Sequence, residues 1–106
     1  MTKFSETKIL EEIDDYIHET YKKHYGDGKY QATDMIIDSG YGEGFCIGNI
    51  MKYAMRYGKK DNKRLELLKI IHYAIIALHI ELRLWLLALE EVWLLGLKGV
   101  NLNDKV

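Results

Sequence analysis

Apolar side chains recur at helical spacing near the start of the chain. The repeat predicts a helix that Ser5 caps and that runs to about Lys23. Its inward face consists of Ile9, Ile13, Tyr16, Ile17 and Thr20. Polar residues fill the opposite face, so this segment is expected to be an amphipathic helix with one buried side.

A glycine-rich turn separates this helix from a shorter one. The run Gly26-Asp27-Gly28 offers positive φ angles and an aspartate that can hydrogen-bond its own backbone. The pattern that follows predicts a short helix over Gln31–Ser39, closed by Gly40 as a C-terminal cap. We expect Met35 and Ile36 of this helix to point inward.

A third helix is predicted from Ile47 to Tyr57, and its two faces contrast sharply. At 100° per residue, the polar face is made up of Asn49, Lys52, Tyr53 and Arg56. The opposite face consists of Ile47, Ile50, Met51 and Ala54. We expect the apolar face to pack against the rest of the chain and the polar face to point away from it.

The longest apolar segment predicts a helix from Lys63 to about Leu97, capped by Asp61 or Asn62. At 1.5 Å per residue it would be about 50 Å long, which exceeds the width of a compact domain of this size. Its polar residues form one stripe, which consists of Lys69, His72, His79, Arg83 and Glu90, with Glu91 at the edge. Because the remaining circumference is apolar, we expect residues 63–97 to act as a long oligomerising helix.

A membrane span is the alternative interpretation of this segment. The charged and histidine residues His79, Glu81, Arg83, Glu90 and Glu91 interrupt the ~18 uncharged residues that a bilayer crossing requires. We therefore expect a homo-oligomer that forms through the C-terminal helix, and no membrane insertion.

Composition narrows the class of protein. The chain has 106 residues, 48% of them hydrophobic, and no proline, which favours a single helical domain over residues 1–106. We predict an all-α fold of three to four helices that assembles into a helical oligomer. The formal net charge of -1 argues against general binding of nucleic acid, so a phosphate site must be a local cluster. The single cysteine, Cys46, and an N-terminus unlike a signal peptide suit a cytoplasmic protein.

Cations and glycines gather around the third predicted helix. Four glycines stand at its expected start, namely Gly40, Gly42, Gly44 and Gly48. Free backbone N–H groups and the helix dipole would favour an anion there. The predicted nucleotide-phosphate site is made up of Gly48, Asn49, Lys52, Tyr53, Arg56, Lys59 and Lys60. Arginine offers a planar fork for phosphate oxygens, and Tyr53 or Tyr57 can stack a base, although a solvated cationic face is the simpler interpretation.

Acidic and histidine side chains give little support for a metal site. Only one Glu-x-x-Asp spacing is present, at Glu12 and Asp15, whereas helical nucleotide pyrophosphohydrolases hold magnesium with two such motifs on facing helices. His72 and His79 lie two turns apart, which is too far for one helix to chelate a metal. We predict no metal site in the protein itself, and Mg²⁺ only as the companion of a bound nucleotide.

One run of residues carries a family resemblance. The pattern Gly48-Asn49-x-x-Lys52-Tyr53-x-x-Arg56-x-Gly58-x-Lys60-Asp61 resembles the signature of a small bacteriophage protein family that includes the nucleotide kinase of T7-type phages. Upstream, His24-Tyr25, Gly28 and residues 30–36 are similar to further elements of that family, as is Glu66-Leu67-x-Lys69-x-x-x-Tyr73 downstream. The resemblance covers a core of residues 24–73, about half of the chain.

The resemblance implies kinase-like phosphoryl transfer to deoxynucleoside monophosphates in the cytoplasm of an infected bacterial host. Lys52, Arg56 and Lys59 or Lys60 would then hold phosphates, and Asn49 would orient an oxygen. His24 or Asp34 would handle a proton as the catalytic group. The alternative is a non-catalytic oligomer that sequesters a nucleotide, for example an antiviral defence signal, and a third interpretation is a helical assembly module without a ligand.

Overall fold

The structure is a computed structural model that describes residues 3–24, 29–60 and 62–99, without the side chains of residues 29–31. These residues form four helices, α1 (Glu6–His24), α2 (Lys29–Asp38), α3 (Gly42–Met55) and α4 (Lys63–Leu97). No strand occurs within the described ranges, so the prediction of an all-α fold with a long C-terminal helix is confirmed. The turn predicted at Gly26-Asp27-Gly28 lies outside the described residues.

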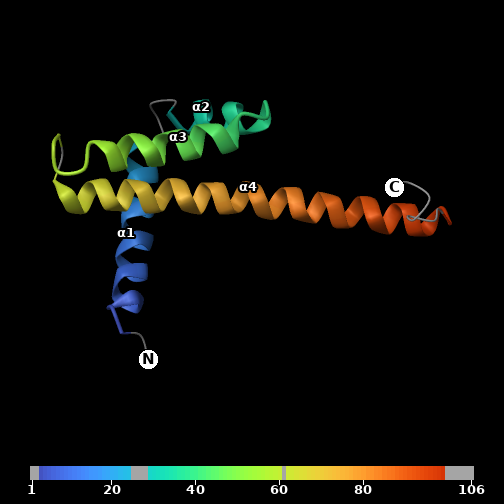
Figure 1. The fold of residues 1–106 in the computed structure, drawn as a ribbon, viewed down its shortest axis with the longest axis horizontal. Helices are drawn as coiled ribbons and strands as arrows, with labels where there is room; N and C mark the ends of the chain where they lie inside the picture. Colours follow the sequence, from blue (N-terminus) through green and yellow to red (C-terminus); the bar gives the residue numbers. More distant parts are fainter. Residues whose placement is uncertain (1–2, 25–28, 61, 100–106) are drawn as a thin grey trace.

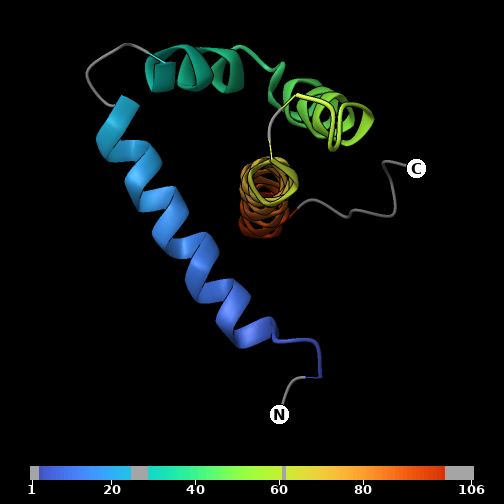
Figure 2. The ribbon, with the colours of Figure 1, turned by 90° about the vertical axis from the view of Figure 1, so that its left-hand side faces the viewer.

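The first three helices gather around one end of α4. α1 crosses α4 near its start, and α3 runs beside the first half of α4 (Figure 1). Along the axis of α4, helices α1, α2 and α3 form an arc around it (Figure 2). The radius of gyration is 18.5 Å, whereas a compact domain of this length would have about 13 Å. The second half of α4 therefore projects beyond the other helices.

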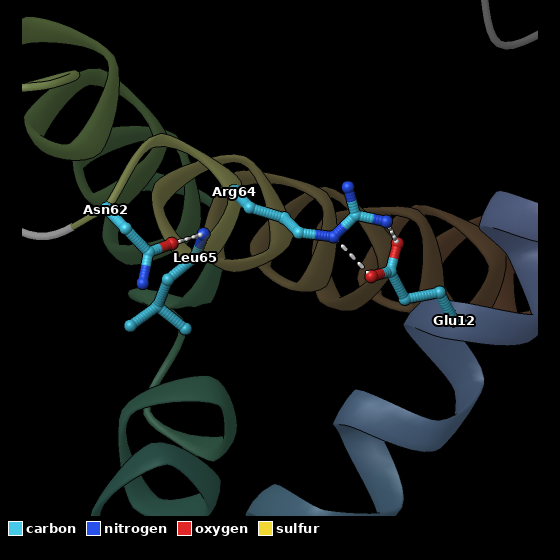
Figure 3. A network of polar contacts seen from close by, with 4 residues as sticks. All are labelled: Glu12, Asn62, Arg64 and Leu65. Carbon is cyan, nitrogen blue, oxygen red and sulfur yellow. Dashed lines mark hydrogen bonds and ion pairs between the residues drawn. The ribbon is translucent and has the colours of Figure 1, made fainter.

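The start of α4 follows the predicted capping. The Asn62 side chain accepts a hydrogen bond from the backbone N–H of Leu65 at 2.7 Å (Figure 3), which satisfies one of the free donors of the first turn. No proline or glycine interrupts the next 33 residues, and α4 continues for 35 residues to Leu97. The predicted boundaries of this helix are confirmed.

An ion pair between side chains fastens α1 to α4. The guanidinium of Arg64 donates two hydrogen bonds to the Glu12 carboxylate, one from Nε and one from a terminal nitrogen (Figure 3). Such a two-point contact fixes both distance and orientation. Glu12 therefore belongs to a contact between helices, a role that its Glu-x-x-Asp spacing does not indicate.

The α3 helix packs with the face opposite to the predicted one. Tyr53 stacks on Tyr73 of α4, and Arg56 forms an ion pair with Glu66 of α4. The predicted packing face is open instead, since Ile47 and Met51 are 46% and 58% exposed. The physical reason lies in α4, which presents an aromatic ring and a carboxylate to α3 and so selects its polar, aromatic face.

The α3 helix also begins earlier than predicted. It starts at Gly42, so Gly44 and Gly48 lie inside the helix, and the expected glycine loop before Ile47 is wrong. Gly42 is buried, and a Cβ atom there would lie 2.7 Å from Cδ1 of Ile80 and 3.1 Å from Cγ1 of Ile37. The glycine thus permits a close approach to α4.

The second helix agrees with the prediction only in part. Gly40 follows α2 with a φ of +92°, as expected for a residue that ends a helix. Met35, expected to point inward, is 71% exposed. Ile37 packs beside Gly42 instead, because the chain turns directly into α3 at that point.

Apolar surface is largely open in the described part of the chain. Ile13 and Cys46 are the buried hydrophobic residues there, whereas the buried polar residues are Glu66 and His72. Every residue from 81 to 94 is exposed. By length and composition, α4 could also cross a membrane, and only 6% of its most apolar stretch is buried.

Candidate anion-binding site

Three cations surround the ring of Tyr53. The Nζ atoms of Lys52 and Lys69 lie 4.7 and 5.1 Å from the ring centroid, and Cζ of Arg56 lies 4.5 Å from it. Each such cation–π contact contributes about 0.5–1 kcal/mol at an exposed site. The ring also stacks on Tyr73, at 5.9 Å between centroids with an interplanar angle of 20°. The cluster joins α3 to α4 and concentrates positive charge at their junction.

Arg56 is engaged by a buried carboxylate. Its Nε lies 3.2 Å from Oε1 of Glu66 and donates to Oε2 at 3.4 Å. Glu66 is fully buried, and the Arg56 side chain is 24% exposed. A buried carboxylate requires such a partner, so Arg56 has a structural role at the α3–α4 contact. The proposed role of Arg56 in phosphate binding stays a prediction, and Glu66 competes for the same guanidinium.

Two residues of the predicted phosphate site, Gly48 and Asn49, are part of the hydrogen-bonded structure of α3. Asn49 donates from Nδ2 to the backbone carbonyl of Phe45 at 2.8 Å, one turn earlier in α3. Gly48 lies in the middle of α3, where backbone N–H groups bond to carbonyls of the preceding turn. The prediction of a phosphate cradle at a helix start around Gly48 is therefore wrong, because the helix begins six residues earlier.

The two lysines after α3 stand apart from the Tyr53 cluster. Lys59 and Lys60 are exposed in the turn that leads to α4. Gly58 adopts a φ of +76° in this turn, and the N–H of Lys59 bonds to the carbonyl of Arg56 at 2.9 Å. The turn thus directs the chain back toward α4, and neither lysine lines a cavity described below.

A large basic cleft lies between the end of α1 and the start of α4. It has a volume of about 680 Å³. Its lining consists of Tyr16, Glu19, Thr20, Lys22, Lys23, His24, Leu65 and Lys69. Three lysines and one carboxylate, that of Glu19, line this space, and the carbonyl end of α1 attracts the cations near it. The predicted catalytic residue His24 therefore lies among cations that can hold an anion.

A smaller cavity connects this cleft with the Tyr53 cluster. Its volume is about 50 Å³, and it shares Tyr16, Thr20 and Lys69 with the basic cleft. Tyr53 and Tyr73 also line it. Burial raises the pKa of the Tyr73 hydroxyl, and the nearby phenols of Tyr53 and Tyr16 raise it further. This phenol consequently remains a neutral donor at physiological pH.

The second predicted catalytic residue, Asp34, lies elsewhere. It lines a separate cavity of about 370 Å³ between α1, α2 and α4, together with Asp38, His79 and Arg83. The structure therefore does not bring His24 and Asp34 together in one cavity. Among the described residues, no group of three acidic, cysteine or histidine side chains is arranged to hold a metal ion.

Sequence reasoning missed most of the cleft. Lys69 is its central member, since it borders both cavities and contacts Tyr53. Lys22 and Lys23 were also absent from the predicted site, because the end of an amphipathic helix commonly carries solvated cations. The element Glu66-Leu67-x-Lys69-x-x-x-Tyr73 was the available signal, since three of its side chains meet α3.

Comparison with protein-family models places residues 19–75 in a family described as a protein of unknown function, DUF3310. The match covers more than half of the chain. This chain belongs to the DUF3310 family. Searches among curated proteins and among solved structures found no match. In this DUF3310 chain, the matched segment contains every residue that lines the basic cleft except Tyr16.

Proposed function

We propose that this DUF3310 protein binds a nucleotide through its phosphate groups in the basic cleft between α1 and α4. The observation that carries the proposal is the convergence of Lys22, Lys23 and Lys69 on one cavity of about 680 Å³. Ligand pockets typically have volumes of about 300–1,000 Å³, and lysine is a common phosphate binder as a point charge. The cleft thus has a suitable size and charge for a phosphorylated small molecule.

Aromatic rings beside the cleft support a nucleotide over a simple anion. Tyr16 borders both cavities, and Tyr53 lines the smaller one. An aromatic face can stack a nucleobase and contributes about 1–3 kcal/mol per base. Lys69 and Tyr16 both line the basic cleft, so Lys69 can contact a phosphate while a base lies against the ring of Tyr16.

Binding is tested with matched lysine variants. Lys22 and Lys23 are exposed, so replacing both with alanine removes cleft charge without loss of packing. We expect Lys22→Ala/Lys23→Ala to weaken the affinity for deoxynucleoside mono- and triphosphates at least tenfold, or about 1.4 kcal/mol. The control is Lys98→Ala, an exposed lysine at the far end of α4, which should bind as the unmodified chain does. Equal affinities in isothermal titration calorimetry would contradict the proposal.

Kinase-like phosphoryl transfer is the second candidate, and the position of His24 favours it. The imidazole lies in the same cleft as three lysines, where it can accept a proton from an attacking phosphate while the lysines neutralise charge. Magnesium would enter with the nucleotide, since it usually binds through substrate phosphates.

An assay of phosphoryl transfer distinguishes a kinase from a protein that only sequesters the nucleotide. A deoxynucleoside monophosphate and a triphosphate donor are incubated with the protein and Mg²⁺, and the products are resolved by chromatography. Formation of the deoxynucleoside diphosphate that is lost in His24→Gln supports the kinase. Tight binding with unchanged ligand recovered after heating supports the non-catalytic alternative.

A further inference from the structure

The open side of α4 carries a heptad pattern of apolar residues. From residue 75 to residue 92, every a and d position is apolar, namely Ile75, Leu78, Leu82, Trp85, Leu89 and Val92. These six residues are between 40% and 68% exposed. An uninterrupted 4-3 spacing of this kind is typical of helices that pack against a second helix.

This seam points away from α3. Tyr73 and Ile80, which occupy the f position of the same heptads, contact α3 through Tyr53 and Gly42. The f position lies on the side of a helix opposite to the a and d positions. The seam is therefore a continuous apolar face that α3 cannot cover.

We propose that a second copy of this chain packs along the seam, with the two α4 helices antiparallel and related by a two-fold axis near residues 83 and 84. In this register Leu82 of each copy lies beside Trp85 of the other copy, and Leu78 lies beside Leu89. The contact is isologous, so both copies use the same surface and the assembly closes as a dimer.

Charge favours the antiparallel orientation. The first half of α4, residues 63–79, has three cations and one carboxylate (Lys63, Arg64 and Lys69 against Glu66). The second half, residues 81–97, has three carboxylates and one cation (Glu81, Glu90 and Glu91 against Arg83). An antiparallel pair places halves of opposite sign together, whereas a parallel pair places halves of like sign together.

The shape of the subunit favours the same orientation. Helices α1, α2 and α3 all lie over the first half of α4 (Figure 1). An antiparallel partner lays each bare half beside the half that carries these helices, so the bare surface gains neighbours. A parallel partner would instead bring two bare halves together with only each other for cover.

The available apolar area meets the requirement of a stable dimer. Eight large hydrophobic residues lie on the seam or at the e positions beside it, and they are 40–68% exposed: Ile75, Leu78, Leu82, Trp85, Leu86, Leu89, Val92 and Trp93. At roughly 100 Å² of open surface each, they offer on the order of 800 Å² per copy, which matches the about 800 Å² per partner of a standard interface.

A matched pair of leucine variants tests the seam. Leu82, on the seam, is 52% exposed, and Leu87, at an f position, is 56% exposed. We expect Leu82→Glu to raise the dimer dissociation constant at least 100-fold in analytical ultracentrifugation of the full chain. Leu87→Glu should leave the dimer in place. A monomer at all concentrations of the unmodified chain, or equal effects of both variants, would overturn the proposal.

Disulfide cross-linking tests the orientation independently of stability. Leu78→Cys and Leu89→Cys are prepared as separate variants, with the unmodified chain as control because its Cys46 is buried. Mixing the two variants under oxidising conditions should yield a disulfide-linked heterodimer that neither variant forms alone. Linkage of each variant to itself would show a parallel pair, and association only with phosphatidylcholine vesicles would show a membrane segment. Either result would refute the antiparallel dimer.

Discussion

Helices α1, α2 and α3 form an arc around the first half of α4, whereas residues 81–94 are exposed at every position. In the first half, the side chains that point inward include Glu66 and His72, both buried. In the second half, leucine and tryptophan side chains meet solvent in the isolated subunit. α4 thus buries polar side chains in its first half and exposes apolar side chains in its second half.

The difference indicates two separate tasks for the two halves. The DUF3310 match ends at residue 75, and it contains the Tyr53 cluster and, apart from Tyr16, the residues that line the basic cleft. The bare half lies beyond this match and has no cleft lysine. Ligand binding, as proposed, would therefore reside in the covered half, and self-association in the bare half.

The Arg56–Glu66 pair offers the strongest way to disrupt the covered half. Arg56→Ala leaves a fully buried carboxylate without this guanidinium, so we expect the free energy of unfolding to fall by about 3 kcal/mol. The double variant Arg56→Met/Glu66→Leu should recover most of the loss, because no buried charge remains. Urea unfolding followed by circular dichroism at a fixed protein concentration measures both. A loss that persists in the double variant would show that the carboxylate is not its cause.

Two glycines of α3 test how closely this helix approaches α4. Gly42→Ala would place a Cβ 2.7 Å from Ile80, and we expect the free energy of unfolding to drop by about 2 kcal/mol. Gly48→Ala is the matched control, since nothing lies within 4 Å of its Cβ position, and it should gain about 0.5–1 kcal/mol. Thermal unfolding of both variants should therefore shift in opposite directions. Shifts of the same sign would mean that α3 does not rest on α4 at Gly42.

The smallest expected effect concerns the phenol of Tyr73. Its pKa is raised above the usual value near 10, first by burial and then by the nearby phenols and the Cys46 thiol. Tyr73 ionises at a lower pH in the unfolded chain than in the folded one. The stability that its neutral phenol contributes is therefore complete below about pH 10 and is lost as the pH rises through the folded-state pKa. Urea midpoints between about pH 9 and pH 11 should fall less steeply in Tyr73→Phe than in the unmodified chain. Identical slopes would indicate a solvated phenol.

Sequence patterns predicted the helices better than their faces. Asn62 is one of the two caps that were predicted, and the helix ends at Leu97, about where it was expected to end, since capping chemistry and the absence of helix breakers act locally. The predicted orientation of α3 was wrong, because its apolar face was expected to pack, whereas Ile47 and Met51 of that face are exposed. Tyr53 and Arg56 turn inward only because Tyr73 and Glu66 of α4 lie opposite them, and no local rule contains that information.

The candidate site shows the same limit. Lys52, Tyr53 and Arg56 were expected to act together, and in the structure both cations lie over the ring of Tyr53. Lys69 joins them from α4, thirteen residues after Arg56. Either His24 or Asp34 was expected to handle a proton, and the two residues line different cavities.

The sequence by itself determined the helical class, the length of α4 and its excess of apolar surface, because periodicity, capping and composition act over a few neighbouring residues. Only the tertiary structure decided which face of α3 meets α4 and which lysines surround the cleft. Those choices depend on side chains far apart in the chain, whose packing and charge are satisfied together or not at all.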